Sequence, residues 1–333
     1  MNAMMNAPIL NRPFAWLLKR EYWESRRGFF WAQVWTACVL LAITVLSIIT
    51  LEVFRSRLGM HVNVGANGTD MNELLNNALS HNMSLVVRGL DASMMSFAVL
   101  AGVVMTFVVF FYFLGALYDD RRDRSILFWK SLPVSDTATV GSKVVSGALI
   151  APLITAGIIL AAYVCNQVIY SLWFAAHGLN PFTLIWAHTE PFEVWLHILA
   201  MVPLYLFWAL PTVGWLLFWS AAVRSKPFLW AVVIPIAAGA LNSWIALLGI
   251  PHVNVGFFWS QLVARSLLSV VPAGWVSVMS PGDLRDAPET IRHFGSYGQM
   301  AHVFATPEMW IGAIVGIALI AAATWFRRWR DEV

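Results

Sequence analysis

Charge is scarce in this chain. Only 12% of its 333 residues are Asp, Glu, Lys or Arg, whereas 59% are hydrophobic. Soluble domains carry about 25% charged residues, so the composition excludes an ordinary soluble protein. The net charge of +3 is a small basic excess, which is typical of the cytoplasmic face of a membrane protein and not of nucleic-acid binding. We therefore expect an all-α integral membrane protein with membrane lipids, and no nucleic acid, among its partners.

Cysteine is also rare. The chain has two, Cys38 and Cys165, and both fall inside apolar runs. Two such residues exclude a disulfide framework, and we expect both to be buried in packing. The eight histidines all fall on the predicted outer side or at an outer helix end, without tight ligand spacing or a neighbouring cysteine. Solvated loop histidines are therefore favoured over a metal site or a pH sensor.

The sequence patterns of self-contained enzymes are absent. There is no Walker A phosphate loop, no HExxH zinc helix and no GxSxG nucleophile turn. No predicted span carries Asp, Glu or Arg at its centre, where proton-driven transporters and pumps need such groups. We expect no catalytic residue, no bound cofactor and no energy source within this chain.

Long uncharged runs are what the sequence has in abundance. Each is long enough to cross about 30 Å of hydrocarbon as a helix. Thr306, Pro307 and Glu308 give the last run a helix start, with a cap residue, a first-turn proline and an acid. The sequence predicts a six-span domain over 28–333, with spans at 28–51, 92–118, 138–170, 194–223, 228–250 and 307–326, and outer loops at 52–91, 171–193 and 251–306.

Two further segments are too polar to span. Residues 1–27 alternate aromatic and basic side chains, which predicts a helix in the cytoplasmic headgroup layer, and not a cleaved signal peptide. Residues 253–279 are apolar but contain Arg265 at their middle, so we expect a re-entrant or interfacial helical pair there. The polar residues assigned to the N-terminal interfacial helix are Lys19, Arg20, Glu21, Arg26 and Arg27.

The basic residues set the orientation. With six spans, 15 of the 21 Lys and Arg residues fall on one side and 6 on the other. Cytoplasmic loops carry the excess of Lys and Arg, so this bias predicts that both termini are cytoplasmic. A seventh span at 253–279 would move the three arginines of the C-terminus to the outside.

The stretch Asp119–Asp136 is the one dense charge cluster between two membrane-length runs. It holds four acidic and four basic residues, and it includes the apolar run 126–129. The charges must lie outside the hydrocarbon. An apolar cluster on a short polar loop is typical of a docking surface, so we expect another protein to bind here.

These features resemble the permease subunit of ABC transporters of the ABC-2 type. The similarity lies in Leu17–Arg27, in Asp119–Ser125, in Ser131–Ser135 with its L-P-V-S run, and in Gly141-Ser142-Lys143 at the start of the third span. The family often has Glu and a Gly-Thr pair where this chain has Asp120 and Arg124-Ser125. The similarity of architecture extends over the whole chain.

The resemblance implies an exporter of the bacterial inner membrane, driven by a separate ABC ATPase subunit that binds ATP and Mg. A second copy of the permease, or a sister permease, would complete the transport path. The 119–136 loop would dock into the ATPase and transmit its closure to the second and third spans. The residues that the resemblance assigns to this coupling loop are Asp119, Asp120, Arg121, Arg124, Ser125, Leu127, Phe128, Trp129 and Pro133.

Two other classes of function stay open. A nucleotide-independent carrier or channel would need polar groups at mid-membrane, for which Asn166, Gln167 and Asn242 are the candidates. A membrane enzyme acting on lipids or peptides would be active without a partner, but the missing catalytic patterns count against it.

Overall fold

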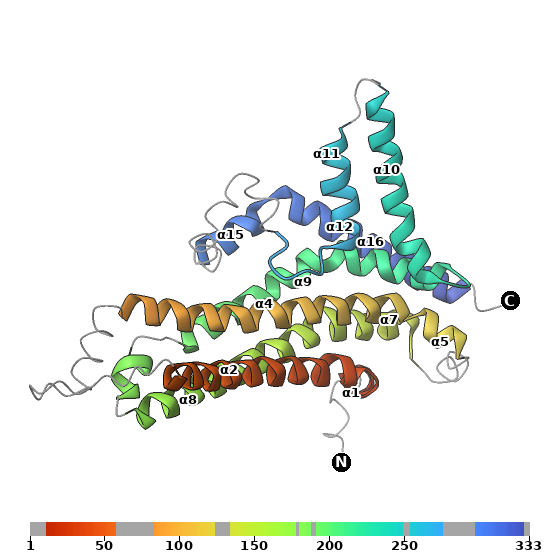
Figure 1. The fold of residues 1–333 in the computed structure, drawn as a ribbon. Coiled ribbons are helices and arrows are strands. Elements are labelled where there is room, and N and C mark those ends of the chain that lie inside the picture. The colour runs from red at the N-terminus through yellow and green to blue at the C-terminus, as the bar shows by residue number, and fades with distance from the viewer. Residues whose placement is uncertain are drawn as a thin grey trace, which may run out of the picture. The chain divides into compact units, whose positions relative to one another are not determined.

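The computed structural model describes residues 11–57, 83–123, 134–177, 180–187, 191–248, 254–275 and 297–329 (Figure 1). Helices dominate these residues, and no strand occurs among them. The all-α class predicted from the composition is confirmed for this part of the chain.

Several helices are joined end to end through π-helical turns (η). The elements are α1 (Asn11–Arg26), η1 (Arg27–Trp31), α2 (Ala32–Arg57), α4 (Met83–Gly115), α5 (Tyr118–Arg122), α7 (Asp136–Val145), η2 (Ser146–Ile150), α8 (Ala151–Ala176), η3 (Phe182–Trp186), α9 (Pro191–Ala222), η4 (Leu229–Val233), α10 (Ile234–Leu247), α11 (Val255–Phe257), η5 (Phe258–Ala264), α12 (Arg265–Leu267), α15 (Tyr297–Ala305) and α16 (Pro307–Trp329).

Six helices are long and apolar enough to cross a membrane. They are Phe14–Phe54, Met95–Arg122, Asp136–Ala176, Trp195–Ala222, Leu229–Leu247 and Pro307–Trp329. Each overlaps one of the six predicted spans. Four extend beyond the expected bounds at one or both ends, whereas the helix over Leu229–Leu247 is shorter than the expected 228–250. The first begins inside the polar segment and continues through η1 without a break. Charged residues are compatible with a helix, so hydropathy marks the apolar part of a helix and not its ends.

The chain divides into two compact units. Unit 1 comprises residues 1–30, 105–154 and 197–333, and unit 2 comprises residues 31–104 and 155–196. The boundaries fall within long helical stretches, so a single helix contributes residues to both units.

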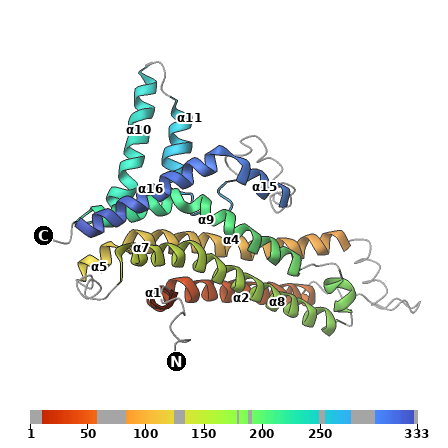
Figure 2. The same cartoon turned by 180° about the vertical axis from the view of Figure 1, so that it is seen from behind.

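The core of unit 1 is apolar and closely packed. Phe113, Leu204, Leu217 and Met309 are fully buried in it. Helices α9 and α16 lie side by side in opposite views (Figures 1 and 2). A side chain on Gly214 would strike the carbonyl of Gly316, and one on Gly316 would strike the backbone of Leu210. Small residues allow this close approach of two apolar helices.

Residues 254–275 form the described part of the predicted helical pair. A continuous helical stretch, from α11 to α12, packs against α10 and is followed by turns over 268–275. Trp259 donates from its indole nitrogen to Ser243 Oγ at 2.9 Å and covers Gly239. The remaining residues of the predicted pair, 253 and 276–279, lie outside the described residues.

Unit 2 holds buried amides among apolar helices. Asn166 Nδ2 donates to Ser93 Oγ at 3.1 Å, and Gln167 Nε2 donates to Tyr163 Oη at 2.5 Å. Cys38 and Cys165 also belong to this unit, and both are exposed. Our expectation that they are buried is therefore wrong. These helices are apolar on every face, so hydropathy does not indicate which face packs.

Candidate functional site

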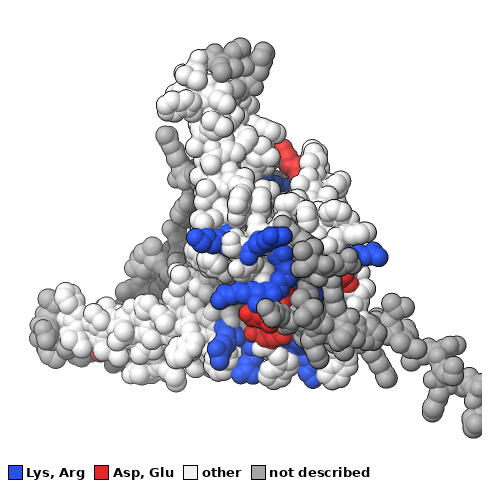
Figure 3. Space-filling view, turned by 90° about the vertical axis from the view of Figure 1, so that its right-hand side faces the viewer, with Lys and Arg blue, Asp and Glu red and all other residues white. Residues whose placement is uncertain are grey.

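Charged side chains gather in one area of the view in Figure 3, and most of the other described residues in that view are uncharged. Five charged residues of unit 1 are nevertheless buried, and four of them are bonded to one another, whereas Arg265 lies apart from these four. The exposed fractions are 1% for Glu21, 9% for Asp120, 3% for Lys143 and 4% for Arg327. Burying a charge costs free energy unless it is paired, so these residues define the candidate site.

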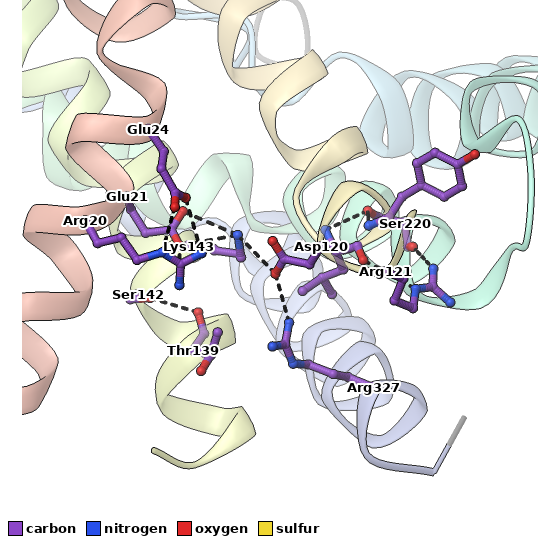
Figure 4. A network of polar contacts seen from close by, with 12 residues as sticks. Arg20, Glu21, Glu24, Asp120, Arg121, Thr139, Ser142, Lys143, Ser220 and Arg327 are labelled. Atoms are coloured by element: carbon purple, nitrogen blue, oxygen red, sulfur yellow. Dashed lines mark hydrogen bonds and ion pairs between the residues drawn. The ribbon is translucent and has the colours of Figure 1, made fainter. Parts of the chain in front are cut away.

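The four residues form one connected network (Figure 4). Lys143 Nζ lies between two carboxylates, 3.3 Å from Glu21 Oε1 and 3.5 Å from Asp120 Oδ2. Arg327 Nη1 lies 3.2 Å from Asp120 Oδ2. The Tyr112 hydroxyl donates to Glu21 Oε2 at 2.9 Å. The network thus joins α1, α4, α5, α7 and α16.

Arg327 also reaches the far end of the charged stretch. Its Nε lies 3.1 Å from Asp136 Oδ1, while its Nη1 binds Asp120. Asp136 is the first residue of α7, whose N-cap residue Ser135 accepts a hydrogen bond from Ala138 N. A guanidinium presents several donors in a fixed plane and can hold two carboxylates at once. The Arg327 side chain of α16 therefore contacts both ends of the 119–136 stretch.

The short helix α5 is fastened to the end of α9. Ser220 Oγ accepts hydrogen bonds from Leu117 N at 3.0 Å and from Tyr118 N at 2.9 Å. Arg121 Nη2 donates to the carbonyls of Ser220 and Val223. The first backbone N–H groups of a helix and the last carbonyls lack partners within it. These bonds satisfy the start of α5 and the end of α9 together.

The predicted loop residues separate into three groups. Asp119 is exposed, as is its neighbour Arg122. Asp120 and Arg121 are bonded to α7, α9 and α16 within unit 1. The other predicted positions lie outside the described residues, and they are Arg124, Ser125, Leu127, Phe128, Trp129 and Pro133.

The predicted interfacial residues also differ from one another. Glu21 belongs to the buried network, whereas Arg20 pairs with Glu24 at 2.8 Å. Lys19 stacks over Trp16 and Arg26 over Trp23, with both tryptophans exposed. Arg27 is exposed. Helix α1 therefore has one acid facing the interior of unit 1 and an aromatic, basic exposed face.

Sequence reasoning missed Arg327, Ser220 and Tyr112, and it placed Lys143 only at the start of the third span. The burial of Arg327 is seen only in the structure. Buried positions recur along α16 at helical spacing, and Arg327 continues that series after Met309, Ala313, Gly316 and Ala323. A cation at the end of a buried stripe indicates a buried partner.

No group of three or more potential metal ligands occurs among the described residues. The chemistry of the site is that of hydrogen bonds and ion pairs, which can transmit force between helices. The chain matches no model of a known family, no curated protein and no solved structure.

Proposed function

We propose that this chain is the membrane permease subunit of an ABC transporter of the ABC-2 type, working as an exporter. A separate ATPase subunit docks on the 119–136 stretch from the cytoplasm. The observation that carries the proposal is the double contact of Arg327 with Asp120 and Asp136. A loop that only set topology would need no buried connection to a distant helix.

The contacts suggest how a push on the loop reaches the bundle. Helix α5 is bonded to α9 through Ser220 and to α7 and α16 through Asp120. A displacement of α5 must therefore move these helices with it or break buried polar contacts. Chains of bonded side chains and rigid helices are the physical means by which distant sites are coupled.

We assign two different roles to the predicted loop residues. Asp120 and Arg121 hold the loop to unit 1, because their polar atoms are engaged there. Asp119 and Arg122 are exposed, and we assign them to contact with the ATPase, together with the apolar residues of the 124–129 segment. ATP and Mg belong to that partner. A second permease completes the transport path.

The same proposal places the N-terminus, the C-terminus and α1 at the cytoplasmic face of a bacterial inner membrane. The exposed Trp16 and Trp23, each stacked with a cation, suit a headgroup layer. The excess of basic residues on this side is in keeping with the same orientation.

The experiment is affinity purification of the tagged chain from its native membrane in mild detergent. We expect a protein with a Walker A motif to copurify in stoichiometric amount. Changing Arg122, Arg124 and Phe128 together to Ala should release it, while Arg328→Ala, an exposed charge on α16, should not. Loss of the partner from neither variant, or the absence of any nucleotide-binding partner, would refute the docking site.

The alternative is a nucleotide-independent carrier or channel. One observation favours it, because Asn166 and Gln167 are fully buried in unit 2 and their carbonyl oxygens make no hydrogen bond to the described residues. Such amides could line a polar path. A carrier would move substrate in vesicles that contain only this chain, whereas the ABC reading requires the ATPase and ATP.

A further inference from the structure

Arg265 is a third buried cation of unit 1, and its contacts differ from those of Lys143 and Arg327. Its side chain is 7% exposed in total. Its guanidinium carbon lies 3.8 Å from the centre of the Trp208 ring. Its Nη2 donates to the backbone carbonyl of Glu308 at 2.8 Å. The guanidinium is therefore stacked on α9 and bonded to the first turn of α16.

Within the part of the chain that the structure describes, Arg265 has no ion-pair partner within 4.0 Å, and its buried Nη1 makes no hydrogen bond. Burial lowers the pKa of Arg265 to about 10, against an opposing effect of Glu308, so the group stays charged at neutral pH. A buried cation with unused donors costs free energy that a bound anion would recover.

The backbone around Arg265 is held in place by neighbouring side chains. Its carbonyl accepts hydrogen bonds from Thr212 and from Ser269, both at 2.9 Å. The Val270 carbonyl accepts from Tyr205 at 3.1 Å. These bonds satisfy carbonyls that the end of the helix leaves without partners. The backbone of Arg265 is thus held in part by α9, independently of the contacts of its guanidinium.

Helix α16 provides space for the guanidinium. A side chain on Gly312 would collide with Arg265 Nη2, so glycine allows the cation to lie against the helix. Trp275 packs edge-on against Trp208, with 6.2 Å between the two ring centroids. Leu262 and Leu268 lie close to Arg265 in sequence, and both are more than half exposed.

From these contacts we infer that Arg265 and Trp208 form a binding site for the anionic head of an amphiphile, a phosphate or a carboxylate. The guanidinium would bind two anion oxygens through its forked donors, as arginine does with phosphates and carboxylates. The apolar tail would lie on the exposed leucines. Because Nη1 is covered, binding of the anion requires the Arg265 guanidinium to move toward the surface while its backbone stays in place. This site goes beyond the proposed function, since binding needs no ATPase.

The test uses the purified full chain in a neutral maltoside detergent. Dodecyl phosphate is titrated while tryptophan fluorescence and the melting temperature are recorded, with inorganic phosphate and additional neutral maltoside as separate arms. We expect saturable binding of dodecyl phosphate. Arg265→Gln should weaken it at least tenfold, and Arg265→Lys, which keeps the charge but loses the fork, should weaken it less. Arg328→Gln, an exposed control, should leave it unchanged.

Each other outcome contradicts the assignment. No saturable binding to the unaltered chain would overturn it, as would equal affinity in the Arg265→Lys and unaltered chains. Saturation by inorganic phosphate at the same concentrations would show that the tail is irrelevant and overturn the amphiphile. If Arg265→Gln does not fold, Arg265→Lys and Trp208→Phe decide, and both must bind more weakly. None of these results bears on ATPase docking, because no ATPase is present.

Discussion

Arg327 Nη1 lies 3.2 Å from Asp120 Oδ2, although 207 residues separate the two in the sequence. Asp120 is in contact with a second cation, Lys143, so this one carboxylate balances charges from α7 and α16. Removing it would leave two buried cations with fewer partners. Both the stability of unit 1 and the position of α5 therefore depend on the Asp120 side chain.

Asp120→Asn should destabilise the chain markedly. Breaking a buried ion pair from one side costs about 3–5 kcal/mol, because the remaining charge stays buried. Thermal unfolding in mild detergent measures the change. Asp119→Asn is the matched control, since it removes the same charge from the exposed neighbouring position and should cost no more than about 0.5 kcal/mol. Equal loss in both variants would contradict a buried network.

Arg327→Gln should loosen both ends of the 119–136 stretch together, because its guanidinium contacts Asp120 and Asp136. Hydrogen exchange by mass spectrometry should show faster exchange in 118–123 and in 136–140. Arg328→Gln alters the next, exposed arginine and should change neither segment. Faster exchange at one end only would show that the two contacts of Arg327 are independent.

Ser220→Ala should weaken the attachment of α5 to α9. Two backbone N–H groups, of Leu117 and Tyr118, lose their acceptor, and an unsatisfied buried donor costs about 1–3 kcal/mol. We expect faster amide exchange at 117–122 and, in the assembled transporter, less transport per ATP hydrolysed. Ser225→Ala, at an exposed serine, serves as the control. Unchanged exchange in Ser220→Ala would show that the contact holds nothing in place.

Gly316→Ala should destabilise unit 1 because the added methyl group meets the backbone of Leu210 and neither helix backbone can yield easily. Overpacking of this kind costs about 1–3 kcal/mol. The melting temperature in detergent measures the effect. Gly157→Ala makes the same change on a helix where nothing lies within 4 Å of the new atom, and it should be neutral or slightly stabilising. A lower melting temperature for Gly157→Ala than for Gly316→Ala would refute the close contact.

The six long helices could be predicted from the sequence because each contains a long apolar run, and each overlaps a predicted span. The arrangement of the candidate site could not be predicted from the sequence. The contact of Glu21 with Lys143 joins residues 122 positions apart, and nothing local distinguishes a buried helix-end charge from one that faces headgroups. The role of Ser220 could not be predicted for the same reason, since no sequence pattern marks which serine of an apolar helix accepts hydrogen bonds from another helix. The two cysteines are exposed although we expected them to be buried, so hydropathy also did not predict which residues pack inside.

The most direct measurement is site-specific cross-linking in native membranes. A photoreactive residue is placed at Arg122, exposed on α5, and in a second variant at Ala187, exposed in the predicted outer loop. The account predicts that position 122 captures a protein with a Walker A motif, more strongly when ATP is trapped, and that position 187 does not. Capture of no nucleotide-binding protein at 122, or equal capture at both positions, would contradict the account.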